Sequence, residues 1–500
     1  MPKPSATKLS GFSGKLTTWQ LTAGSAAFGL VIAAGAVAAA GPWDSSGQRT
    51  AERDRAASQE AWGGADHAGR TPGSAPEAAP SAPSVLAGLG APAGVAPAPT
   101  DSALAEVLDP LLRDPALGPE RSAVVLDAAS GKKLYGKGGG DGLTPASTIK
   151  IATAVAALSA VGPDHRIATK TVLEPDSSDV VLVGGGDPTL TARKDGRYTD
   201  TAASLRTLAE DTARSLKSRD IDEIKLSYDT SLYSGPPQHP IGPNENITPV
   251  SALMADEGRL DDSSSGPAPR AADPAAEAAK KFAGFLADKG IKTKPASKSA
   301  PESDPTPSKA SDRAESLAKV ESPPLSALVE RMLTHSDNDI AEALARQAAV
   351  AAKEPVSFDG AGKAVRAALD KQGLPLSGAK FADGSGLDRA DRVSAELLAA
   401  LLDHAADPGR PELRSVVTGL PVAGFTGTLV DRYPKDSPGT GVVRAKTGTL
   451  TGVNSLAGTV VDADGRLLLF AFMTTGTTDP QSAQKALDHM ASTVANCGCR

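Results

Sequence analysis

Ser147-Thr148-Ile149-Lys150 opens an almost uncharged run that continues Ile-Ala-Thr-Ala-Val-Ala-Ala-Leu-Ser-Ala to residue 160. Apolar residues recur in this run at helical spacing, which predicts a buried helix over about 147–160. Residues 122–137 precede it and read as a β-hairpin, with an apolar strand at 123–127, a turn and a return strand. A strand hairpin that leads into a buried helix indicates an α/β (α+β) domain, with a sheet flanked by helices.

The remaining strand and helix signals divide into two groups. Between the first helix and residue 295, strands and amphipathic helices alternate, which indicates a separate, smaller α/β unit. These signals are strands at 180–183 and 223–226 and helices at 201–218 and 271–290. Further helices and three strands then follow, and the signals for them lie at 325–352, 361–373, 393–406, 442–447, 455–461, 467–473 and 480–495. We therefore predict a main domain formed by 101–165 and 324–500, a domain inserted at 166–295, and a flexible linker at 296–323.

The N-terminal part of the chain indicates export. Residues 21–41 are uncharged and follow three lysines, Lys3, Lys8 and Lys15. Such a run is long enough to cross a bilayer as a helix, with its basic side in the cytoplasm. We predict a cytoplasmic tail at 1–20, a transmembrane signal anchor at 21–41 and a disordered Ala/Pro-rich tether at 44–100. The alternative is a cleaved signal peptide, because Ala36-Val37-Ala38 resembles a cleavage site. Either alternative places the body of the protein outside the cytoplasm, and the first attaches it to the cell membrane.

Composition excludes some classes of function. The formal charge is −7 and no long basic run occurs, so we expect no nucleic acid partner. The six histidines form no His-Glu-x-x-His array, and the two cysteines, Cys497 and Cys499, form no zinc-type pair. We therefore expect no metal site. Cys497 and Cys499 are compatible with either a local disulfide or two free thiols.

The first candidate motif is Ser147-x-x-Lys150. Residues three apart share one face of a helix, so the lysine can reach the serine hydroxyl. Burial lowers a lysine pKa, and the neutral amine can then take the serine proton. The motif alone is weak because five other serines, Ser5, Ser130, Ser316, Ser377 and Ser482, also have a lysine three residues on. Only Ser147 opens an apolar helix after a hairpin, and Ser482, at the start of the terminal helix, is the one rival.

The second candidate motif is Ser336-Asp337-Asn338, which is the one Ser-x-Asn in the sequence. A hydroxyl and an amide two residues apart on a loop can point into one cleft, where the serine relays a proton and the amide binds the substrate. The alternative is a helix N-cap, in which Asp337 or Asn338 begins the helix that contains Ile340.

The third candidate motif is Lys446-Thr447-Gly448-Thr449, which contains the one Lys-Thr-Gly in the sequence and ends a predicted strand. The lysine can hold a substrate carboxylate, and the glycine lets a ligand approach the strand edge. An ordinary strand end with a turn glycine is the alternative.

The three motifs together, in this order, resemble those of the serine penicillin-recognising enzymes. The interval between residues 147 and 336 is too long for a compact class A β-lactamase. The chain is similar to the class C low-molecular-weight penicillin-binding proteins, the D-alanyl-D-alanine carboxypeptidase/endopeptidase family, which carry inserted domains at this point. Gly184-Gly185-Gly186-Asp187-Pro188-Thr189-Leu190 and Asp383-Gly384-Ser385-Gly386-Leu387 also resemble family segments. One departure is a short polar stretch at about 261–273, where many members carry a further nested domain.

The resemblance implies a function and a role for each residue. Ser147 is the acylated nucleophile, Lys150 its base, and the backbone amides of Ser147 and Thr449 form the oxyanion hole. The other implied roles are proton delivery by Ser336 and Lys446, substrate binding by Asn338, and carboxylate binding by Lys446, Thr447 and Thr449, with Gly448 at the strand edge. The implied partners are peptidoglycan peptides ending in D-Ala-D-Ala and β-lactam antibiotics, and no cofactor is needed. A β-lactamase or esterase on the same scaffold and an inactive peptidoglycan-binding protein are the alternatives.

Overall fold

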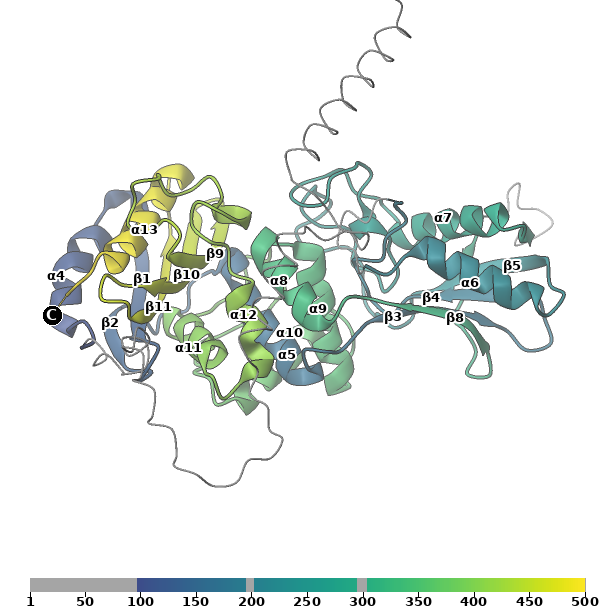
Figure 1. The fold of residues 1–500 in the computed structure, drawn as a ribbon, viewed down its shortest axis with the longest axis horizontal. Helices are drawn as coiled ribbons and strands as arrows, with labels where there is room; N and C mark the ends of the chain where they lie inside the picture. The colour runs from purple at the N-terminus through teal and green to yellow at the C-terminus, as the bar shows by residue number, and fades with distance from the viewer. Residues whose placement is uncertain (1–96, 195–201, 295–303, 500) are drawn as a thin grey trace, which may run out of the picture. The chain divides into compact units, whose positions relative to one another are not determined.

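The computed structural model describes residues 97–194, 202–294 and 304–499 (Figure 1). A five-stranded antiparallel sheet forms the centre of the main domain, with strand order β2-β1-β11-β10-β9. Its strands are β1 (Glu120–Asp127), β2 (Lys133–Lys137), β9 (Val443–Leu450), β10 (Val453–Val461) and β11 (Leu467–Thr475). Because β1 pairs with β11, the N-terminal hairpin and the C-terminal strands form one sheet across the insertion.

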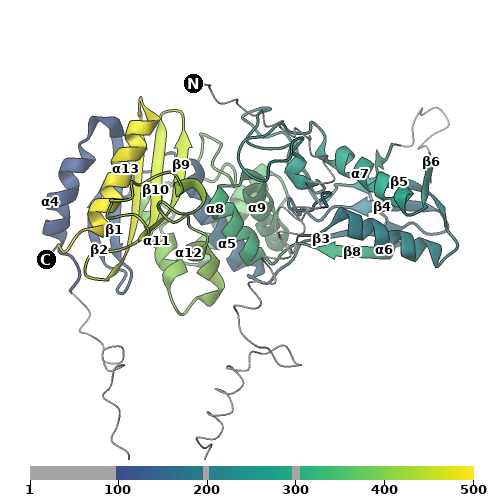
Figure 2. The ribbon, with the colours of Figure 1, turned by 45° about the horizontal axis from the view of Figure 1, so that its top comes forward.

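Helices cover both faces of this sheet (Figure 2). On one face, α4 (Asp101–Leu112) and α13 (Pro480–Ala495) enclose a core that includes Leu108, Phe470 and Met490. The other face packs on a helical group that surrounds α5, the helix whose residues are almost all buried. This group comprises α5 (Lys150–Val161), α8 (Leu325–His335), α9 (Asn338–Ala352), α10 (Phe358–Lys371), α11 (Ala395–Ala406) and α12 (Arg414–Thr418). Burial on all sides explains why α5 is uniformly apolar rather than amphipathic.

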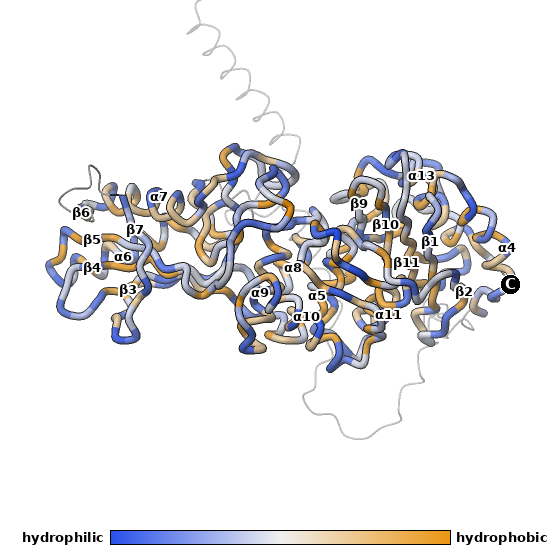
Figure 3. The backbone as a smooth tube through the Cα atoms, turned by 180° about the vertical axis from the view of Figure 1, so that it is seen from behind, coloured by the Kyte–Doolittle hydropathy of each residue, from blue (hydrophilic) through white to orange (hydrophobic). Residues whose placement is uncertain are grey.

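The inserted domain has its own sheet, with strand order β6-β5-β4-β3-β8 and a short strand, β7, that pairs with β5. Its strands are β3 (Ala168–Leu173), β4 (Asp179–Val183), β5 (Glu223–Asp229), β6 (Lys292–Lys294), β7 (Thr306–Pro307) and β8 (Glu315–Glu321). Two amphipathic helices, α6 (Leu205–Lys217) and α7 (Pro274–Asp288), bury their apolar residues in a core shared with this sheet. Hydrophobic and hydrophilic positions alternate along both helices (Figure 3).

The prediction of a flexible linker at 296–323 is wrong for its second part. Residues 315–321 form β8, which pairs antiparallel with β3 at the edge of the inserted sheet. Leu317, Ala318 and Val320 pack partly against the inserted core, while charged residues point outward. An edge strand with one polar face resembles a loop in composition, because charges on such a strand prevent pairing with another chain. The inserted domain therefore extends to residue 321.

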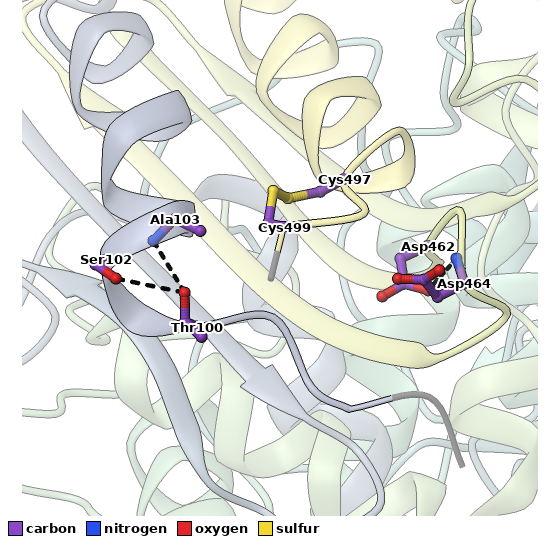
Figure 4. The surroundings of a disulfide bond; sticks show 7 residues. All are labelled: Thr100, Ser102, Ala103, Asp462, Asp464, Cys497 and Cys499. Atoms are coloured by element: carbon purple, nitrogen blue, oxygen red, sulfur yellow. Dashed lines mark hydrogen bonds between the residues drawn. A yellow bond between two sulfur atoms is a disulfide. The ribbon is translucent and has the colours of Figure 1, made fainter. Parts of the chain in front are cut away.

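The two cysteines form a disulfide, Cys497–Cys499, after the end of α13 (Figure 4). The backbone N–H of Thr100 donates to the carbonyl oxygen of Cys499 at 3.0 Å. Thr100 is also the N-cap of α4, since its hydroxyl accepts from the N–H of Ala103 at 3.3 Å. The disulfide thus lies against the start of the folded domain.

No helix within 97–194, 202–294 or 304–499 is long and apolar enough to cross a membrane. The predicted tail at 1–20, the predicted anchor at 21–41 and nearly all of the predicted tether at 44–100 lie outside the described residues.

Candidate active site

Ser147 lies on a sharp turn that joins the hairpin to α5. Ala146 before it adopts a left-handed conformation with φ of 48°, which is unfavourable for a residue with a side chain. The Thr148 hydroxyl donates to the carbonyl oxygen of Pro145 at 2.7 Å and so stabilises the turn. Such local strain is typical of functional sites. The turn leaves Ser147 partly exposed while its neighbours are buried.

Lys150 is completely buried one helical turn beyond Ser147. Its Nζ lies 3.0 Å from Ser147 Oγ, 2.7 Å from Asn338 Oδ1 and 2.5 Å from the carbonyl oxygen of Ser385. Burial lowers the pKa of Lys150 from 10.5 to about 8, and the nearby carboxylate of Asp383 opposes this shift. The lysine can therefore lose its proton near neutral pH and act as a base toward the serine in contact with it.

Ser336 and Asn338 lie on either side of a helix boundary. Ser336 ends α8 in a left-handed conformation with φ of 59°, and α9 begins at Asn338. Asp337 between them is the N-cap of α9, because its Oδ1 accepts from the N–H of Ile340 at 3.0 Å. The capping alternative thus holds for Asp337, while Asn338 lies in contact with Lys150. Asn338 Oδ1 contacts Lys150, and its Nδ2 donates to the carbonyl oxygen of Asn246 at 2.9 Å, whereas no hydrogen bond of the Ser336 side chain is recorded within the described part of the chain.

The third motif lies in β9, an edge strand of the sheet. The segment before it, at Pro421–Ala423, covers the outer side of β9 as far as Ala445. Beyond that point the described residues place no strand on this edge, and of residues 446–449 Thr449 is exposed while the other three are buried. Thr447 is buried and its hydroxyl lies 2.9 Å from that of Thr428, while Thr449 is exposed and its hydroxyl accepts from Gln484 at 3.3 Å.

Lys446 is as deeply buried as Lys150. Its Nζ donates to the carbonyl oxygen of Thr447 at 2.8 Å. Burial and then the positive charges of Lys150 and Arg432 hold the pKa of Lys446 well below its usual value. Two lysines with lowered pKa values, facing one site from α5 and from β9, are suited to exchange protons with a reacting group.

Gly448 brings β9 against the turn that carries Ser147. A Cβ at this position would lie 2.6 Å from the carbonyl oxygen of Pro145 and 2.1 Å from Ser455 Oγ, which itself donates to Pro145 O at 2.7 Å. The strand and the nucleophile turn can approach this closely because residue 448 has no side chain.

We therefore expect Gly448→Ala to displace β9 from the nucleophile turn. The rate of acylation by a fluorescent penicillin should fall by about 10-fold or more, since even a small displacement of groups that position the reacting atoms has a large effect on the rate. Gly284→Ala is the matched control, because a Cβ at Gly284 on α7 would meet nothing within 4 Å. Equal acylation rates for the two variants would contradict the close packing of β9 on the turn.

The structure adds site residues that the sequence interpretation did not assign. Ser385 contributes a carbonyl oxygen to Lys150, and it lies in Asp383-Gly384-Ser385-Gly386-Leu387, a segment noted only for its resemblance to the family. Thr428 approaches Thr447 from a segment with no sequence signal. These contacts join residues far apart in the chain, so no local pattern could predict them.

Two buried clusters of potential metal ligands lie close to this site, namely His239, Glu342 and Asp383, and Glu257, Asp337 and Asp339. In the second cluster the carboxylates face arginines instead of open space. Arg259 pairs with Glu257 at 2.8 Å, and Arg270 pairs with Asp339 at 2.9 Å. These contacts are those of an ion-pair network beside the Asp337 cap.

The fold and the site are those of a serine hydrolase, with a buried lysine in contact with a serine hydroxyl. The family model for the D-Ala-D-Ala carboxypeptidase 3 (S13) family matches residues 104–269 and 263–496. A carboxypeptidase of Mycobacterium tuberculosis is 35% identical over 437 residues, which is 85% of this chain and 90% of that protein. Carboxypeptidase DacB of Mycolicibacterium smegmatis is 36% identical over 413 residues, which is 81% of this chain and 86% of that protein. The crystal structure of penicillin-binding protein 4 (DacB) from Haemophilus influenzae has the same fold, with a TM-score of 0.62 and 23% identity over 78% of this chain and 97% of that one.

The chain belongs to the D-Ala-D-Ala carboxypeptidase 3 (S13) family. The predicted family, the α/β fold class and the serine carboxypeptidase class of the enzyme are thus confirmed.

Proposed function

We propose that this enzyme hydrolyses peptidoglycan stem peptides that end in D-Ala-D-Ala, through an acyl-enzyme on Ser147, and that penicillin acylates the same serine. The observation that carries the proposal is the 3.0 Å contact between Ser147 Oγ and the buried amine of Lys150, whose pKa is lowered to about 8. This contact provides a nucleophile with its base in place.

We assign one or more groups to each step. Neutral Lys150 takes the proton of Ser147, and the serine oxygen attacks the carbonyl carbon between the two D-alanines. The backbone amides of Ser147 and Thr449 stabilise the oxyanion. The bond to the terminal D-alanine then breaks, Ser336 and Lys446 pass a proton to its amine, and water hydrolyses the ester. Lys446, Thr447 and Thr449 hold the terminal carboxylate, and no cofactor takes part in these steps.

One assay separates this proposal from its two alternatives. The soluble body of the protein is incubated with a fluorescent penicillin and, separately, with a D-Ala-D-Ala peptide. Stable label on the protein together with release of D-alanine supports the proposal. Rapid loss of label indicates a β-lactamase or esterase, and the absence of both signals indicates a protein that only binds peptidoglycan.

The pH dependence of acylation follows from Lys150. Its pKa of about 8 means that the amine is mostly protonated, and inactive as a base, below pH 8. The acylation rate constant should therefore rise with pH and level off above about 8, and at pH 6 it should be roughly 100-fold below the plateau. Stopped-flow acylation from pH 6 to 9.5 measures this profile, and a rate that is constant between pH 6 and 8 would exclude Lys150 as the titrating base.

We also propose that the body is extracytoplasmic and is held at the cell membrane by residues 21–41. The support is the uncharged run behind three lysines, and cleavage near residue 40 to give a secreted protein is the alternative. Detection of an N-terminal peptide from residues 1–20 in the mature protein would distinguish the two.

Residues 44–100 should be the first site of limited proteolysis, because their composition cannot bury enough apolar area to offset chain entropy. The product should begin near Asp101, where α4 starts, and should retain acylation by penicillin. Loss of activity on cleavage within 44–95 would show that the catalytic unit extends further toward the N-terminus.

A further inference from the structure

The loop 383–387 lies directly beneath the nucleophile turn. Gly386 has φ of 83°, and a Cβ there would come within 2.0 Å of the carbonyl oxygen of Ala146, the residue before Ser147. On its other side, a Cβ at Gly384 would lie 2.7 Å from the carbonyl oxygen of Ala341 in α9. The loop therefore fills the space between α9 and the turn. Any shift of the loop would displace the turn and, with it, Ser147.

The same loop presents an acceptor to the catalytic base. The carbonyl oxygen of Ser385 lies 2.5 Å from Lys150 Nζ. The peptide N–H groups on the other side of the loop, those of Gly384 and Ser385, donate to Glu342 Oε1 at 3.0 and 2.9 Å. Glu342 thus orients this part of the loop so that one carbonyl points toward the lysine.

Asp383 closes the loop through its side chain. Its carboxylate accepts from the N–H of Gly386 at 2.6 Å, the N–H of Asp388 at 2.8 Å and the hydroxyl of Ser385 at 3.0 Å. Burial favours the neutral acid, but hydrogen bonds from His239, from the Asp391 carboxyl and from the loop hold the pKa of Asp383 well below its usual value. Asp383 is therefore a buried anion whose donors define the shape of the loop.

One of these donors, His239, comes from the inserted domain, from the segment between β5 and α7. Its side chain is 0% exposed, and its Nε2 lies 2.9 Å from Asp383 Oδ2. The other ring nitrogen, Nδ1, accepts from the N–H of Ile241 at 3.2 Å. Because Nδ1 is an acceptor, Nε2 carries the N–H and donates it to Asp383. The ring also meets Phe358 edge-on, with centroids 5.1 Å apart.

We propose that His239 is a positioning residue for the catalytic base: its Nε2–H holds Asp383, and Asp383 shapes the loop that sets the Ser385 carbonyl against Lys150. The inserted domain then has a role in acylation itself, through one side chain. The inference rests on the proposed acylation of Ser147 and goes beyond it by assigning a residue outside the three motifs.

A metal site is the competing interpretation, since ligand atoms of His239, Glu342 and Asp383 lie within 4.8 Å of one another. The oxygens of this cluster already accept from protein donors, however. Glu342 Oε2 pairs with Arg346 at 3.0 Å, and both oxygens of Asp383 are hydrogen-bonded as described above. The protein itself therefore supplies the positive partners that a metal would otherwise provide.

The arrangement acts on Lys150 in a predictable direction. The Ser385 carbonyl and the charges of the nearby carboxyl groups of Asp383, Asp337, Glu342 and Asp391 favour its ammonium form, while the charge of Lys446 disfavours it. If Asp383 loses the His239 donor, the loop is held by fewer hydrogen bonds and the Ser385 carbonyl is no longer fixed against Lys150. Loss of this acceptor disfavours the ammonium form, so the pKa of Lys150 should fall while its geometry becomes less suitable for proton transfer.

The experiment compares His239→Gln with His239→Asn. The two amides have the same donor chemistry, but only the longer glutamine can place its Nε2 where the imidazole Nε2 lies. His404→Gln, at a partly buried histidine of α11, is the matched control. Acylation rate constants are measured with a fluorescent penicillin from pH 6 to 9.5 on the labelled fraction, so that unfolded protein does not contribute, and thermal unfolding is followed by circular dichroism.

We expect the plateau rate of His239→Asn to fall by roughly 10- to 100-fold, an effect typical of lost positioning. The acidic limb of its pH–rate profile, where the acylation rate constant rises with pH, should move to lower pH. His239→Gln should stay within about 3-fold of wild type with its limb unmoved, and His404→Gln should match wild type. A folded His239→Asn with the wild-type rate, or with a lower rate but an unmoved limb, would overturn the inference, and so would a His239→Gln as slow as His239→Asn. If wild type itself is not acylated, the proposed function fails, which is a separate result.

Discussion

Ser147→Ala should abolish the covalent penicillin adduct and lower D-alanine release by about 10⁴-fold or more. The reason is that Ser147 Oγ is the hydroxyl that contacts the lysine base at 3.0 Å, and removal of a nucleophile leaves only the catalysis due to substrate binding. The fold should be unaffected, since Ser147 is partly exposed and small. Mass spectrometry of penicillin-treated protein locates the adduct, and release of D-alanine gives the rate.

Ser482→Ala is the matched control for this substitution, because Ser482 also has a lysine three residues later. Its hydroxyl donates to Asp479 Oδ2 at 2.5 Å and so belongs to the N-cap of α13. Ser482→Ala should therefore keep full acylation. An adduct on Ser482, or a normal adduct yield in Ser147→Ala, would overturn the assignment of the nucleophile.

Lys446→Ala should lower both penicillin acylation and D-alanine release by roughly 10²-fold or more, which corresponds to a few kcal/mol for a desolvated anion left poorly paired. Substrate and penicillin both carry a carboxylate, and we propose that Lys446, in the edge strand β9, binds it. Because burial and nearby positive charges hold its pKa well below the usual value, we expect an arriving carboxylate to favour the protonated form. Lys446→Met is the control for lost volume, since it retains most of the buried side chain without the charge.

An ester substrate without a carboxylate distinguishes the two roles of Lys446. If the residue binds the carboxylate, the ester should be affected much less than penicillin in both variants. If both substrates slow equally, Lys446 acts in proton transfer. Lys446→Arg should retain only part of the wild-type activity, because a planar guanidinium differs in shape from an ammonium group. Unchanged rates for all substrates in a folded variant would show that the third motif is a coincidence.

The local elements were predictable because each depends on residues that are close in the chain. The hairpin at 122–137, the helix after Ser147 and the terminal strands all appear within a few residues of their predicted bounds. In β8 the prediction failed, because an edge strand with charged residues has too few apolar positions to differ from a loop.

The sequence by itself determined the chemistry of the site, through the residue types at Ser147, Lys150, Asn338 and Lys446, since order and spacing are properties of the chain. Only the tertiary structure decided how that chemistry works. The pKa of Lys150 depends on complete burial and on acceptors from residues 338 and 385, and the free edge of β9 depends on which strands pair. Desolvation and hydrogen bonding act through space, between residues that are far apart in the sequence. Residues such as His239 in the inserted domain, which contribute in this way, therefore have no local sequence pattern that identifies them.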